Sequence, residues 1–128
     1  MVSAGSVAAD LLVEACRPGS GDDLRLETVR GLATDLGRRV ASNGGTPDSM
    51  IEAALACADL ATLAVCNVPG LPEGRKPLGA AATHLAAGAT HALLALVESG
   101  GPNENVSRDA RSAGWKADLA VRQLTEMG

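Results

Sequence analysis

Two pairs of residues, each with a spacing of seven, are the sharpest chemical feature of this sequence. His84 and His91 are the only histidines in the chain, and they lie in one long apolar stretch. Glu52 and Asp59 lie in the apolar stretch before it. Seven residues correspond to about two helical turns, or about 10.5 Å of rise. If both stretches are helices, each pair shares one face of its helix.

An antiparallel hairpin of the two helices would bring the histidines to the carboxylates. For a turn centred near residue 72, Asp59 shares a level with His84, and Glu52 shares a level with His91. A carboxylate bonded to one imidazole nitrogen fixes the tautomer and raises the basicity of the other nitrogen, as a general base requires. These four residues are therefore predicted catalytic residues. Two simpler interpretations are that each pair marks the least buried side of its helix, or that the pairs are structural bonds in the core.

The same spacing argues against a metal centre. Two ligands about 10.5 Å apart along one helix do not converge on an ion bound at about 2.1 Å. The ferritin-like pattern Glu-x-x-His also fails, because Ala81 and Gly88 stand three residues before the histidines. The sequence contains no GxSxG, HExxH, GxGxxG or CxxC motif. We therefore expect no metal site and no cofactor.

Two other features could bind a ligand or a partner. Trp115 lies off the apolar stripe of its helix, as is typical of an interface or a ligand wall, although it could also cover the first helix or the bundle end. Arg75 and Lys76 precede a helix expected to begin at Pro77, where backbone N–H groups and the helix dipole favour an anion. A solvated basic loop is the alternative. Trp115, Arg75 and Lys76 are predicted ligand-binding residues.

These residues must be positioned by helices. Apolar residues recur at helical spacing, and no run of β-branched residues with a period of two occurs. Thr46 and Pro47 form a strong helix start, with threonine as N-cap and proline at the first helical position. The sequence predicts an all-α fold, a four-helix up-and-down bundle with an N-terminal helix packed across it. The core helices are expected at about 22–42, 47–67, 77–99 and 104–126, and the N-terminal helix at about 3–16.

Composition predicts one domain, residues 1–128, that associates with itself. Its alanine-rich helices can approach closely, but they bury little apolar area at about 25 cal/mol per Å². We therefore expect a homodimer. The small residues between Gly79 and Ala95 serve either core packing or a dimer contact across a twofold axis.

Charge and cysteine usage favour the cytoplasm. The net charge of −4 argues against nucleic-acid binding and against docking on anionic membranes. Polar residues interrupt the apolar stretches, so we expect no transmembrane helix. The three cysteines show no ligand spacing, which fits small buried side chains in a reducing compartment. Arginine outnumbers lysine, which suggests a bacterial genome of high GC content.

Together these features favour a non-catalytic binding protein. It would be a cytoplasmic homodimer that holds a small molecule, a peptide or a partner helix as an accessory factor in a bacterial pathway. Trp115 and the face of His84 and His91 would line the cleft between subunits. The alternative is a small cofactor-free acid–base enzyme, such as a lyase, isomerase or cyclase, that uses a His–carboxylate pair. A third possibility is an immunity or regulatory protein that covers a partner's surface.

Overall fold

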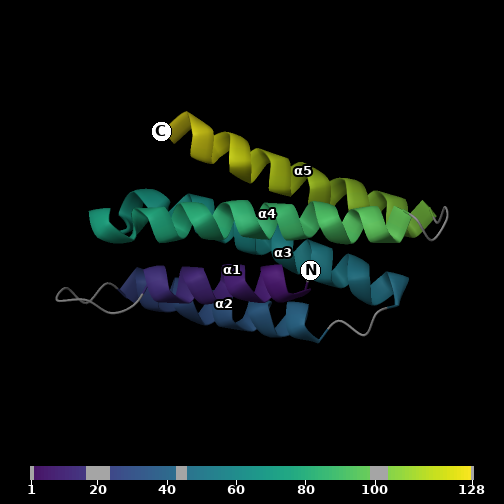
Figure 1. The fold of residues 1–128 in the computed structure, drawn as a ribbon, viewed down its shortest axis with the longest axis horizontal. Helices are drawn as coiled ribbons and strands as arrows, with labels where there is room; N and C mark the ends of the chain where they lie inside the picture. The colour runs from purple at the N-terminus through teal and green to yellow at the C-terminus, as the bar shows by residue number, and fades with distance from the viewer. Residues whose placement is uncertain (1, 17–23, 43–45, 99–103, 128) are drawn as a thin grey trace.

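The fold is all-α. The computed structural model describes residues 2–16, 24–42, 46–98 and 104–127, and within these ranges there is no strand. Two short 3-10 turns, η1 (Val68–Gly70) and η2 (Glu73–Arg75), join the third helix to the fourth. Figure 1 shows the five α-helices, which are α1 (Val2–Ala15), α2 (Leu24–Ala41), α3 (Pro47–Asn67), α4 (Lys76–Glu98) and α5 (Glu104–Met127).

The predicted helices are all present, and each end lies within two residues of its predicted position. The start of α3 confirms the local prediction. The backbone N–H of Ser49 donates to Thr46 Oγ1 at 3.1 Å, and Pro47 occupies the first turn. The predicted start of the second helix at residue 22 and the predicted end of the fourth at residue 99 lie outside the described residues.

The grouping of the helices differs from the predicted one. Helices α1 to α4 pack in a ring, each against the next and α4 against α1, and neighbours run antiparallel (Figure 1). Helix α5 lies outside this ring and packs on α3 and α4. The predicted bundle of the second to fifth helices is therefore not confirmed, because α1 packs fully against α2 and α4.

The central helices are α3, which contacts all four other α-helices, and α4, which packs against three. Their small residues let the helix axes approach closely. Gly79 lets the connection between α3 and α4 pack against the start of α4, because a Cβ there would lie 2.8 Å from Leu71 Cδ1 and 3.0 Å from Val68 Cγ2. Of the ten glycines and alanines from Gly79 to Ala95, five are buried in the core, three are half-buried, and Gly88 and Ala95 are exposed.

The apolar character of α3 and α4 follows from this central position. Segments Asp48–Gly70 and Glu73–Glu98 are long and apolar enough to cross a membrane by length and composition alone. Of the residues in their most apolar windows, 56% and 50% are buried against the rest of the molecule. Core helices of soluble proteins pass the same test.

Candidate functional site

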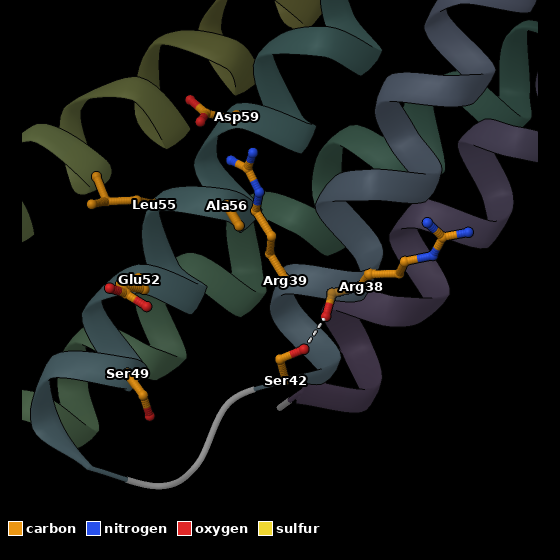
Figure 2. Close-up of a pocket in the computed structure, with 8 residues that line it drawn as sticks. All are labelled: Arg38, Arg39, Ser42, Ser49, Glu52, Leu55, Ala56 and Asp59. Atoms are coloured by element: carbon orange, nitrogen blue, oxygen red, sulfur yellow. Dashed lines mark hydrogen bonds between the residues drawn. The ribbon is translucent and has the colours of Figure 1, made fainter.

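An open groove runs between α2 and α3, and Figure 2 shows its more polar half. Two adjoining cavities of about 640 and 420 Å³ form it, and both are lined by Arg39 and Asp59. Cavities of this size accommodate small organic ligands. We call this surface the α2/α3 groove; its residues are Leu32, Asp35, Leu36, Arg38, Arg39, Ser42, Ser49, Glu52, Leu55, Ala56, Asp59, Thr62, Leu63 and Cys66.

Helical periodicity places these side chains along the groove. On α2, Leu32, Leu36 and Arg39 follow at spacings of four and three, so they share one face. On α3 between residues 52 and 66, one stripe of the helix is exposed or half-buried while the rest of the segment is buried; its members are Glu52, Leu55, Asp59, Thr62, Leu63 and Cys66. The leucines are incompletely covered, and Leu32 is 48% exposed. The groove therefore offers apolar surface to a ligand or a partner.

Charges of both signs line the groove. Arg39 extends from α2 toward α3, and Glu52 and Asp59 project from α3 (Figure 2). Arg38 makes an exposed ion pair with Asp35 at 3.5 Å. Among the described residues, neither Arg39 nor Glu52 forms an ion pair within 4.0 Å. A cation and a carboxylate thus remain available to a ligand with complementary groups.

Asp59 also connects the groove to α5. Its Oδ1 lies 3.4 Å from Lys116 Nζ, and both side chains are partly exposed. Lys116 is the one cation that the structure pairs with a described carboxylate of α3. The pair holds the Asp59 carboxylate at the edge of the groove.

The histidines lie on a different surface. His84 and His91 are exposed on α4, which contributes no residue to either cavity. His91 Nε2 bonds to Asp118 Oδ1 of α5 at 2.8 Å, whereas His84 has no hydrogen-bond partner within the described ranges. The expected Asp59–His84 and Glu52–His91 pairs do not form, because the carboxylate stripe of α3 faces α2 and α5.

The His91–Asp118 pair nevertheless has the chemistry expected of a histidine beside a carboxylate. Since a carboxylate only accepts hydrogen bonds, Nε2 donates and Nδ1 of the neutral ring is left as a base. The two side chains are 49% and 67% exposed. Water therefore reaches the pair, which weakens its electrostatic interaction.

The three predicted ligand-binding residues do not come together in the groove. Trp115 is 65% exposed on α5, on the side opposite the buried Ala113 and Ala117. Lys76 Nζ bonds to Glu73 Oε1 at 2.8 Å, and Arg75 is half-buried with an interaction of its own within the chain. At the predicted anion site, Leu71 and Val68 fill the space beside the Gly79 backbone.

The cysteines divide into two kinds. Cys16 and Cys57 are buried, as predicted, and burial raises the pKa of both thiols, to about 11 for Cys57. Cys66 is exposed and lines the groove, so the prediction of a buried side chain is wrong there. No group of three His, Cys, Asp or Glu residues capable of holding a metal ion occurs in the described part of the chain.

Sequence reasoning missed the α2 wall of the groove. None of the predicted catalytic or ligand-binding residues lies on that helix. The sequence feature that could have indicated this wall is Leu32, an apolar residue on the arginine-rich side of α2. In the structure its side chain is exposed. A single exposed leucine is common on protein surfaces, so Leu32 becomes informative only beside Leu36 and Leu63, which line the same cavity.

Comparison of this chain with family models, with curated proteins and with solved structures gives no match.

Proposed function

We propose that this protein is a non-catalytic binding protein whose site is the α2/α3 groove. Its ligand is a small amphipathic molecule or a short peptide segment, with an apolar body over the leucines and polar groups toward Arg39 and Glu52. The protein works as a homodimeric accessory factor in the bacterial cytoplasm, with no role for nucleic acid or membrane. Support for this proposal comes from one observation above all, an open groove that joins apolar leucine surface to Arg39 and Glu52, neither of which forms an ion pair with another described residue.

The test uses anilinonaphthalene sulfonate, a dye with an apolar body and one anionic group. We expect the native protein to bind it and Leu32→Asn to weaken that binding, because a neutral amide replaces apolar surface in the groove without adding a charge that would attract the sulfonate. Leu96→Asn is the matched control, since Leu96 is 44% exposed on α4 while Leu32 is 48% exposed on α2. A dye that fails to bind, or that binds both variants equally, contradicts the proposal.

An acid–base enzyme is the second candidate, and the His91–Asp118 hydrogen bond is the observation that favours it. In this function His91 Nδ1 takes a proton from the substrate, and Asp118 holds the ring in the required tautomer. Long-range proton–nitrogen NMR spectra test the geometry. We expect His91 to carry its proton on Nε2 in the native protein and to lose this preference in Asp118→Asn; a mixture of tautomers in both proteins would remove the support for this function.

A further inference from the structure

We infer that the α2/α3 groove is covered by a second copy of this chain, placed face to face about a twofold axis parallel to the groove. The inference rests on the proposed function, because it names what closes the site. Two facing grooves would enclose the ligand between the subunits, because each copy would cover the open side of the other copy's groove.

The distribution of charge across the groove is the first argument for a second copy. The α2 side carries Arg39, together with Arg38 and its ion-pair partner Asp35, so one positive charge is in excess there; the α3 side carries Glu52 and Asp59. Within its described length α3 carries acidic residues and no basic residue. One wall is therefore basic where the other is acidic. A twofold axis along the groove exchanges the walls, so the basic wall of each copy meets the acidic wall of the other.

The distribution of polar and apolar residues along the groove determines the direction of the twofold axis. Arg39 and Asp59 line both cavities, so they lie at one level. On one side of this level the lining is polar, with Ser42, Ser49 and Glu52; on the other it is richer in leucine. An axis parallel to the groove keeps every level in place, which sets leucine on leucine and Arg39 against Asp59 of the second copy. An axis that lies in the interface but runs perpendicular to the groove would set the polar half on the apolar half and the basic wall on the basic wall.

The groups required for this contact are exposed. Arg39 and Glu52 have no ion pair within 4.0 Å in the described part of the chain, and Asp59 meets Lys116 at 3.4 Å. The alanine-rich core supplies the reason to associate, since small side chains bury little apolar area within one chain. A second copy would cover the leucines of α2 and α3 as well.

Sedimentation velocity on the full chain tests the inference, with two variants that are complementary to each other. Arg39→Glu places like charges opposite each other at both symmetry-related contacts. Asp59→Lys sets a lysine opposite Arg39 of the second copy at both contacts. It is combined with Lys116→Glu, so that the ion pair between α3 and α5 is kept with its charges exchanged. We expect a wild-type dimer, and each variant alone to dimerise at least about tenfold more weakly. Mixing the two variants pairs opposite charges at both contacts and restores the dimer.

Arg122→Glu is the control, because Arg122 is exposed on α5 and lines neither cavity. It should leave the dimer constant unchanged, and circular dichroism should show all variants folded. A wild-type monomer overturns the inference, as does a dimer that Arg39→Glu leaves intact or a mixture that fails to recover association. The proposed function stands separately, since a monomer that binds the dye through Leu32 would keep the binding site and lose only the second copy.

Discussion

Helix α3 forms one wall of two grooves, and only one of them is filled within the chain. In the α3/α4 groove lies α5, whose buried Ala113, Ala117 and Ala120 let it approach closely. The α2/α3 groove is open, with half-buried leucines along α3 and an exposed Leu32 on α2. The same helix therefore has one side built as core and another built as surface.

The filled groove shows what this scaffold requires of an occupant. An alanine stripe supplies the close contact, and polar pairs fix the helix on both flanks, Lys116 with Asp59 toward α3 and Asp118 with His91 toward α4. The open groove also has charged residues along both walls, including Arg39 and Glu52, which form no ion pair with another described residue. Its apolar surface consists of leucines rather than alanines. Leucines at a surface bury more area per side chain than alanines do, so this groove is suited to an occupant that comes from outside the chain.

The largest contrast is expected between two leucines of α3. Leu60, 1% exposed, faces the core, and Leu55 lines the open groove. Leu60→Ala should lower the free energy of unfolding by about 2–5 kcal/mol, since it removes buried methyl groups and leaves a cavity. Leu55→Ala should cost about 1 kcal/mol or less, because water already reaches that side chain. Urea denaturation measures both. Equal losses would mean that the groove is part of the core.

The two cysteines of α3 should differ in reactivity, with Cys57 reacting much more slowly than Cys66. Burial shields the Cys57 thiol from the reagent and raises its pKa to about 11, whereas Cys66 is exposed in the groove. Alkylation followed by peptide mass spectrometry measures each thiol separately. Similar rates for the two would show that the inner side of α3 is open to solvent.

The same shift predicts a dependence of stability on pH. The folded state holds the Cys57 proton more tightly than the unfolded chain, so the stability from this thiol is fully present below pH 9.0. It is lost as the pH rises through the folded pKa, about 11. Urea denaturation at a series of alkaline pH values should show the loss, and Cys57→Ala should remove that part of it. An identical decline in the variant would assign the effect to other groups.

Two glycines of α2 should respond in opposite directions to alanine. A Cβ at Gly37 would lie 2.8 Å from Ala9 Cβ of α1, whereas nothing lies within 4 Å of a Cβ at Gly31. Gly37→Ala should cost about 1–3 kcal/mol by forcing the helices apart. Gly31→Ala should gain about 0.5–1 kcal/mol, because alanine loses less backbone entropy in a helix. Thermal denaturation shows whether each substitution lowers or raises the stability of the protein. Destabilisation by Gly31→Ala would contradict an open outer face of α2.

The smallest effect is expected for the polar pair on the flank of α5. His91 and Asp118 are 49% and 67% exposed, so their hydrogen bond is screened by water. Asp118→Asn should change the unfolding free energy by less than about 0.5 kcal/mol. Denaturation of wild type and variant at neutral pH provides the comparison. A loss above about 2 kcal/mol would mean that this pair, rather than the alanine stripe, holds α5 in place.

The helices could be predicted because their signals are local. The Thr46 cap depends only on the next few residues, so it was predicted from sequence, and it occurs. The bounds of each helix likewise follow from helical spacing and from nearby proline and glycine residues. The packing order of the helices could not be derived from such local signals. Assigning α1 to the outside and α5 to the ring was wrong because small-residue stripes occur on both helices and sequence does not order them.

The partner of His91 shows the same limit at the level of a site. Residue numbers along a hairpin give the level of each side chain, but they do not give the rotation of each helix about its axis. That rotation depends on α5, which packs on both α3 and α4 and takes Asp59 and His91 as separate partners. The exposure of Cys66 was within reach, since it follows Glu52 and Asp59 at intervals of seven on the stripe already recognised as polar.

The most direct test uses the unmodified protein and its exposed Cys66. This thiol lies in the leucine-rich half of the groove with Leu32, where the inferred second copy would cover it. The rate of Cys66 alkylation is measured across a range of protein concentrations, with sedimentation on the same samples. Our account predicts that the rate falls as the dimer forms. A rate that stays constant while the protein dimerises would place the contact on another face, and constant rates with no dimer would leave the groove without a second copy.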